Sequence, residues 1–148
     1  MKTIYLAGPL FSNAERQWNA KLKNYLEQTG LYKVLLPQEM CKGLNPNERD
    51  GDSLKLFHIC ENGVRDADLV LAVLDNADVD SGTAWEVGFA RGIGKKVIGV
   101  RTDFRLCEVF NVNIMLYHGV DEFISDFSGD DELLFDKVIS ALQPYRFK

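Results

Sequence analysis

The chain has 148 residues, about the length of one domain, of which 46% are hydrophobic and 26% are charged. This composition is typical of a globular protein with its own core, and it excludes disordered and fibrous chains. The net charge of −5, without a cluster of Lys and Arg, argues against binding to a nucleic acid polymer. We therefore expect one domain over residues 1–148.

The cysteines and the amino-terminal segment predict a cytoplasmic protein. Cys41, Cys60 and Cys107 are odd in number and form no CxxC pair, which fits a reducing compartment. The first apolar stretch is too short for a signal peptide, and no run of about 18 apolar residues could span a membrane. We therefore expect no membrane association and a small molecule as the ligand.

Apolar segments of strand length alternate along the chain with segments of helical periodicity. Several of the strands are apolar on both faces, as in a parallel sheet that is covered on both sides. The predicted elements are, in chain order, a strand at Thr3–Ala7, a helix at Asn13–Gln28, a strand at Tyr32–Leu36, a helix at Ser53–Asp66, a strand at Leu69–Leu74, a helix at Ser81–Ile93, a strand at Val97–Val100, a weaker strand at Glu122–Ile124 and a helix at Asp131–Leu142. This order predicts an α/β fold, with a doubly wound, mostly parallel five-stranded sheet and helices on both faces, flavodoxin-like or Rossmann-like.

Such a sheet binds its ligands beyond the carboxyl ends of its strands. The loops expected there are 7–13, 37–40 and 75–80, and residues 42–52 are expected to form a surface loop or lid. Gly8 and Pro9 stand where a phosphate-binding motif would carry several glycines, so we expect no dinucleotide or triphosphate. His58 and His118 lie outside every zinc or serine-hydrolase motif, and we expect neither a metal nor a cofactor.

The candidates for chemistry are acidic. Asp75, Asp78 and Asp80 follow the third strand, and Glu86 lies within an apolar helical run. A buried carboxylate is costly unless it is paired, although the helix N-terminus offsets part of the cost. Asp80 or Ser81 can serve as the N-cap of this helix. Spacing alone leaves three interpretations open: solvated acidic residues, a magnesium site, or two carboxylates that act on a glycosidic bond.

Several segments resemble the nucleoside 2-deoxyribosyltransferase family. They are Tyr5–Phe11, Ala67–Asp75 and, most specifically, Asp80–Ala90, and the likeness continues through Gly94–Asp103 and Asn113–Met115. The resemblance implies a flavodoxin-like subunit that transfers a 2-deoxyribosyl group between nucleobases with retained configuration. The implied partners are small deoxynucleosides and free nucleobases.

The resemblance also implies a role for each matching residue. Glu86 matches the nucleophile that attacks C1′, Asp80 matches the aspartate that exchanges a proton with the base, and Tyr5 matches the tyrosine that orients the nucleophile. Asn113 and Met115 match a segment that completes a neighbouring subunit's site, which implies a homo-oligomer, a dimer or larger. The predicted substrate-binding residues are Gly8, Pro9, Leu10, Phe11, Gln38, Asp75, Ser81, Gly82, Asn113 and Met115.

Cys60 departs from the family pattern, because several relatives carry an aspartate at this place. The departure leaves Asp80, helped by Asp75 or Asp78, to manage the proton of the base. The main alternative function is an N-glycosidase that hydrolyses 2′-deoxynucleoside 5′-monophosphates or nucleosides. The first loop lacks the arginine and paired glycines of that branch, and Asp80 would repel a nearby phosphate. A third interpretation is a non-catalytic nucleotide sensor. The sequence does not determine whether purines or pyrimidines are preferred.

Overall fold

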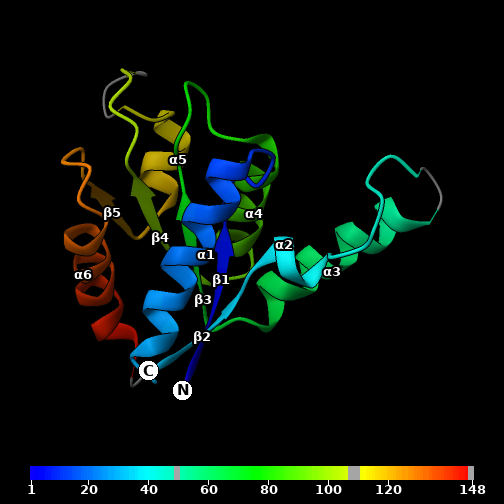
Figure 1. The fold of residues 1–148 in the computed structure, drawn as a ribbon, viewed down its shortest axis with the longest axis horizontal. Coiled ribbons are helices and arrows are strands. Elements are labelled where there is room, and N and C mark those ends of the chain that lie inside the picture. Colours follow the sequence, from blue (N-terminus) through cyan, green and yellow to red (C-terminus); the bar gives the residue numbers. More distant parts are fainter. Residues whose placement is uncertain (49–50, 107–110, 147–148) are drawn as a thin grey trace.

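The structure is a computed structural model that describes residues 1–48, 51–106 and 111–146 (Figure 1). Strands and helices alternate along the chain, as predicted. They are β1 (Lys2–Ala7), α1 (Asn13–Gln28), β2 (Tyr32–Leu35), α2 (Pro37–Met40), α3 (Asp52–Asp66), β3 (Leu69–Val73), α4 (Ser81–Gly92), β4 (Lys96–Arg101), α5 (Ile114–Gly119), β5 (Glu122–Ser125), α6 (Asp131–Leu142) and the 3₁₀ turn η1 (Gln143–Tyr145).

The five strands form one parallel sheet in the order β2-β1-β3-β4-β5. Helices α1 and α6 cover one face of the sheet, and α3, α4 and α5 cover the other (Figure 1). The predicted doubly wound fold is therefore confirmed. The chain reverses its direction across the sheet between β1 and β3, so the loops that follow these two strands diverge and open a crevice at their carboxyl ends.

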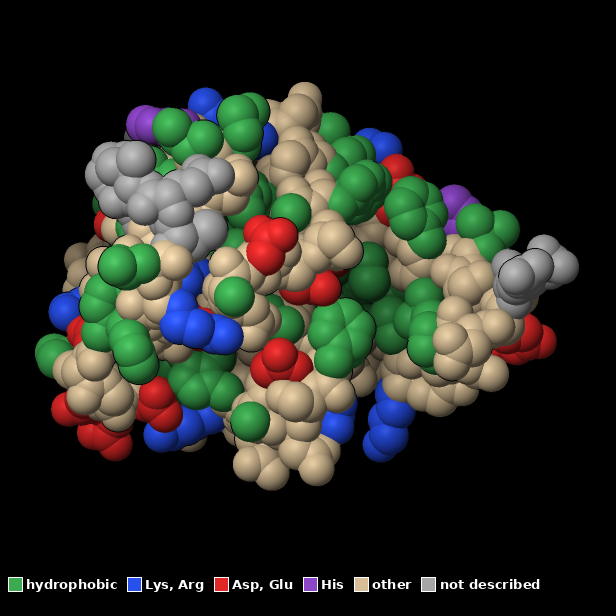
Figure 2. Space-filling view, turned by 90° about the horizontal axis from the view of Figure 1, so that it is seen from above, with side chains coloured by type: hydrophobic (Ala, Val, Ile, Leu, Met, Phe, Trp, Pro, Cys, Tyr) green, Lys and Arg blue, Asp and Glu red, His purple; other side chains and the backbone are tan. Residues whose placement is uncertain are grey.

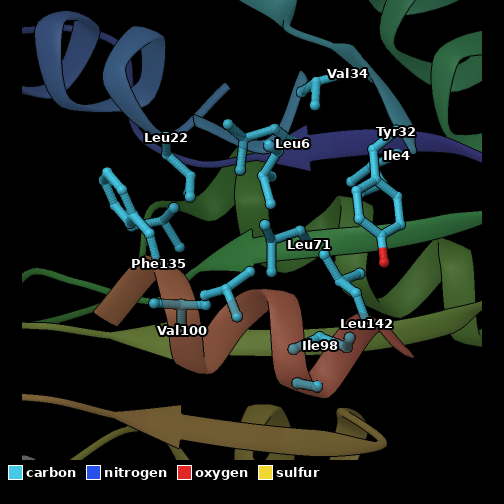
Figure 3. Packing of buried hydrophobic residues seen from close by; sticks show 14 of the residues in the cluster. Ile4, Leu6, Leu22, Tyr32, Val34, Leu71, Ile98, Val100, Phe135 and Leu142 are labelled. Atoms are coloured by element: carbon cyan, nitrogen blue, oxygen red, sulfur yellow. The ribbon is translucent and has the colours of Figure 1, made fainter. Parts of the chain in front are cut away.

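Side chains of β1 point alternately to the two faces of the sheet. Ile4 and Leu6 join the larger core beneath α1 and α6, part of which is shown in Figure 3. Tyr5 and Ala7 face the opposite way and join the core beneath α3 and α4. Because side chains alternate with a period of two in a strand, this register alone aims Tyr5 at the helices that carry Cys60 and Glu86.

Polar side chains fix where the helices begin. Ser12 and Glu15 form a reciprocal capping box at the start of α1, with N–H···O distances of 3.1 Å and 2.6 Å. Asp80 caps α4, and Asp130 caps α6. Each cap satisfies backbone N–H groups that have no partner inside the helix, and it contributes about 1 kcal/mol.

Two short helices differ from the sequence prediction. Residues 37–40 were expected to be a loop, and this prediction is wrong, since Pro37 starts the one-turn helix α2. Proline suits the first helical turn because its fixed φ is helical and its missing N–H would be unsatisfied there. Helix α5 was not predicted, since six residues are too few to show a helical period. No helix in the described part of the chain combines the length and hydrophobicity that crossing a membrane requires.

Candidate active site

Tyr5 and Glu86 form a hydrogen-bonded pair at the centre of the candidate site. The Tyr5 hydroxyl donates to Glu86 Oε1 over 2.5 Å, joining the central strand β1 to α4. Tyr5 is completely buried. A Cβ on Gly63 of α3 would lie only 2.7 Å from the Tyr5 ring, so the glycine lets α3 pack directly against that ring. The packing leaves the ring little room to move.

The surroundings of Glu86 keep its proton affinity high. Burial raises the pKa of Glu86 to about 7, the hydrogen bond from Tyr5 opposes this rise, and the negative charge of Asp80 adds to it. Burial, together with the charge of Glu86, raises the pKa of Tyr5 far above its usual range, so its hydroxyl stays protonated. Glu86 therefore changes its ionisation near neutral pH beside a fixed donor, which is typical of a catalytic carboxylate.

The two carboxylate oxygens of Asp80 differ in their hydrogen bonds. Its Oδ2 accepts hydrogen bonds from the Thr83 N–H at 2.8 Å and from the Thr83 hydroxyl at 3.1 Å. In the described part of the chain Oδ1 has no protein partner. The capping bonds therefore hold the Asp80 side chain in place and leave one oxygen to meet a ligand.

Glu86 and Asp80 line one cavity of about 500 Å³, within the range of small-molecule sites. Seen from the carboxyl ends of the strands, acidic side chains lie near the middle of the surface with hydrophobic side chains around them (Figure 2). The cavity is lined by Gly8, Leu10, Phe11, Arg16, Pro37, Gln38, Cys41, Leu44, Pro46, Leu56, Cys60, Asp80, Gly82, Thr83 and Glu86. Seven of the predicted site residues thus meet around one space, with Tyr5 bonded to its wall.

Asp75 and Pro9 line a different cavity, of about 460 Å³. Both oxygens of the Asp75 carboxylate are engaged there, by the N–H and hydroxyl of Thr102 and by the N–H of Asp103. These bonds tie the loop after β3 to the loop after β4. Asp75 therefore links two loops and does not line the Glu86 cavity, and its role in substrate binding stays a prediction.

Ser81, Asn113 and Met115 lie on a third concave surface, a groove of about 940 Å³ between α4 and α5. The Asn113 side chain accepts a hydrogen bond from the Met115 N–H at 2.9 Å, and Met115 is 77% exposed. None of these three residues lines the Glu86 cavity of its own chain. That Asn113 and Met115 complete a neighbour's site stays a prediction.

Arg16 is a cavity residue that the sequence did not reveal. Its guanidinium donates to the carbonyls of Leu10 at 2.8 Å and Phe11 at 3.0 Å, and to Asn13 Oδ1. In the sequence it was only a polar residue in the first turns of a helix. Gln38, which was predicted, is held by α1 through its bond to the Arg16 carbonyl at 2.9 Å. The residues of α1 therefore shape the rim of the cavity.

The family model described as nucleoside 2-deoxyribosyltransferase matches residues 4–139. The chain belongs to this family. The match covers β1 from Ile4 onward, the other four strands and most of α6, so Tyr5 and Glu86 both lie within the part of the chain that matches the nucleoside 2-deoxyribosyltransferase family.

Solved structures agree with the nucleoside 2-deoxyribosyltransferase fold. A conserved protein from Enterococcus faecalis V583 is 27% identical, with a TM-score of 0.77, over 96% of this chain and 99% of that one. A 2-deoxyribosyltransferase from Bacillus psychrosaccharolyticus is 24% identical, with a TM-score of 0.71, over 89% and 95%. A Clostridium botulinum CMP N-glycosidase is 18% identical, with a TM-score of 0.63, over 93% and 99%. No curated protein matches the chain.

Proposed function

We propose that this protein transfers a 2-deoxyribosyl group between nucleobases through a covalent intermediate on Glu86. The observation that carries the proposal is the Tyr5–Glu86 hydrogen bond of 2.5 Å at the wall of a nucleoside-sized cavity. Family membership and the similar fold of a 2-deoxyribosyltransferase support it. Asp80, in the same cavity, supplies the second carboxylate that such a reaction uses.

In the first half of the reaction Glu86 acts as the nucleophile. Tyr5 occupies Oε1, so Oε2 attacks C1′ of the deoxynucleoside. The C1′–N bond breaks, its electron pair leaves with the base, and the base receives the proton that Oδ1 of Asp80 took up from solvent when the nucleoside bound. The developing oxocarbenium ion is stabilised by the Glu86 charge, and a glycosyl ester forms.

In the second half a different base enters the vacated part of the cavity. Its nitrogen attacks C1′, the ester bond breaks, and the electron pair returns to Glu86. Asp80 Oδ1 takes up the proton that the entering base loses, which restores the starting state. Two inversions at C1′ give net retention of configuration.

The test is incubation with deoxyinosine or thymidine together with free adenine, followed by chromatography of the products. Formation of deoxyadenosine is expected. Intact-mass and peptide analysis of a rapidly quenched sample should place a deoxyribosyl group on Glu86. If the sugar is found on Asp80 instead, the assigned roles are wrong, and if no deoxyadenosine forms, transfer itself is wrong.

The second candidate is an N-glycosidase that hydrolyses 2′-deoxynucleoside 5′-monophosphates. The observation that favours it is Arg16, whose side chain brings a positive charge to the cavity and bonds only to carbonyl and amide oxygens in the described part of the chain. A guanidinium without a carboxylate partner can attract a phosphate. Parallel incubation with the monophosphates distinguishes the two, since release of free base and deoxyribose phosphate identifies the hydrolase.

Tyr5→Phe is expected to slow the reaction by about 10- to 100-fold, since a hydrogen bond to a charged group is worth about 1.5–3 kcal/mol. Loss of the donor also raises the pKa of Glu86, so the acidic limb of the pH profile of kcat/KM should move to higher pH. Tyr25→Phe is the matched control, because the Tyr25 hydroxyl also donates to a carboxylate, that of Asp136 on α6, and Tyr25 does not line the Glu86 cavity. Equal profiles for Tyr5→Phe and Tyr25→Phe would contradict the assigned role.

A further inference from the structure

Thr83 holds the Asp80 carboxylate through two different groups. Its N–H donates to Asp80 Oδ2 over 2.8 Å, the bond that an N-cap aspartate ordinarily makes with the third residue of its helix. Its hydroxyl donates to the same oxygen over 3.1 Å, and this second bond depends on the side chain at position 83. Thr83 is only 1% exposed. The partner of this buried hydroxyl is therefore the carboxylate that we propose to exchange a proton with the base.

The two donors occupy both acceptor positions of Asp80 Oδ2. A carboxylate oxygen has two lone pairs, and here the Thr83 N–H takes one and the Thr83 hydroxyl takes the other. A proton on Oδ2 would have to displace one of these donors. Oδ1 accepts no hydrogen bond from the described residues, so a proton on Oδ1 displaces none. The bonding pattern therefore favours Oδ1 as the oxygen that carries a proton.

Gly82 leaves the space that Asp80 Oδ2 needs. A Cβ at position 82 would lie 3.1 Å from this oxygen, so a larger residue would push the carboxylate away from Thr83. Asp80, Gly82 and Thr83 all line the cavity that contains Glu86, and Thr83 lies one turn before Glu86 on α4. The first turn of α4 therefore fixes Oδ2 in the same cavity as the proposed nucleophile.

We propose that Thr83 is a positioning residue whose hydroxyl keeps the exchangeable proton of Asp80 on Oδ1. In the first half of the reaction this proton passes from Oδ1 to a nitrogen of the leaving base, which also takes the electron pair of the C1′–N bond. Without the hydroxyl, Oδ2 has a free lone pair and can hold the proton itself. A molecule protonated on Oδ2 cannot protonate the base from Oδ1. This role rests on the proposed function, since Thr83 acts only through Asp80.

The test compares Thr83→Val, which has the shape of threonine without the hydroxyl, with Thr83→Ser, which keeps the hydroxyl. The ordinary donors are deoxyuridine and deoxyguanosine, whose bases need a proton to leave. The activated donors are 5-fluorodeoxyuridine, whose base carries negative charge more easily, and 7-methyldeoxyguanosine, whose base is already positively charged. The measurement is the rate of base release in a single turnover. It reports cleavage of the C1′–N bond whether the sugar then passes to a second base or to water.

Thr83→Val should slow base release from the ordinary donors by about 10-fold, the effect of one hydrogen bond to a charged group, and from the activated donors by less than about twofold. Thr83→Ser should keep the wild-type ratio between the two kinds of donor. Thr29→Val is the control and should also keep this ratio, because the Thr29 hydroxyl donates to the Leu26 carbonyl and Thr29 does not line the Glu86 cavity. A loss of packing alone would lower stability in urea and slow both kinds of donor equally.

The assigned role of Thr83 is overturned if Thr83→Val slows both kinds of donor to the same extent, or if Thr83→Ser behaves like Thr83→Val. In either case the wild type still releases base, so only the role of Thr83 fails. If the wild type releases no base from the four donors or from their 5′-monophosphates, the proposed function fails, and the role of Thr83 fails with it. The wild-type rate therefore distinguishes the two failures.

Discussion

Glu86→Gln is expected to lower the rate of deoxyribosyl transfer by about 10⁴-fold or more, the usual scale for removal of a nucleophile. The amide keeps the size of the side chain and can still accept a hydrogen bond from Tyr5, so the cavity should keep its shape. An uncharged amide cannot form the glycosyl ester, however. The measurement is the initial rate of deoxyadenosine formation, together with mass analysis for the ester.

The matched control for Glu86→Gln is Glu61→Gln. Glu61 lies on α3, pairs with Arg65 at 3.0 Å, and does not line the Glu86 cavity. Its loss should change the rate by less than about twofold, as is usual for a surface ion pair. A Glu86→Gln enzyme that keeps more than a tenth of the wild-type rate would falsify the assignment of Glu86 as the nucleophile.

The second large effect concerns stability: the free energy of unfolding should depend on the ionisation of Glu86. The pKa of this carboxyl is raised from 4.5 to about 7 by burial. Between these two values the folded chain binds a proton that the unfolded chain has released, so the free energy of unfolding falls as the pH rises. The contribution of Glu86 to the free energy of unfolding is fully present below pH 4.5 and is lost as the pH rises through 7. The loss amounts to about 3 kcal/mol.

Urea unfolding of the wild type and of Glu86→Gln, at pH 5 and at pH 8.5, measures this effect. The glutamine cannot ionise, so the variant should gain stability relative to the wild type between the two pH values by about 2 to 3 kcal/mol. Other carboxylates, such as Asp68 and Asp126, have lowered pKa values, but they are present in both proteins and cancel in the comparison. A difference that stays constant with pH would contradict the raised pKa.

Local signals in the sequence predicted most of the fold. Both ends of α1 were predicted as observed from its helical period, and the structure explains the start of the helix by the capping box of Ser12 and Glu15. The strands that are apolar on both faces predicted a parallel sheet that is covered on both sides. Helices α2 and α5 have four and six residues, so they are too short for a period to be recognised.

The site was less predictable, because its contacts join distant parts of the chain. Tyr5 and Glu86 are 81 residues apart, and only the family resemblance suggested that they meet. Asp75 was predicted to assist Asp80, but the Asp75 carboxylate bonds to the loop after β4, and Asn76, with a φ of 84°, turns the chain beside it. No pattern in the sequence pointed to Arg16 as a cavity residue. Helical periodicity shows which residues are apolar, but it does not show where a long polar side chain lies.

The position of β1 in the sheet has a consequence for how the protein is made. A ribosome completes β1 first, yet this strand lies between β2 and β3 and its Tyr5 bonds to a residue of α4. The contacts of the first strand with β3 and α4 can therefore form only after α4 has been translated. A chain truncated before Glu86 would keep the hydroxyl of the pair and lose the carboxylate that accepts its hydrogen bond.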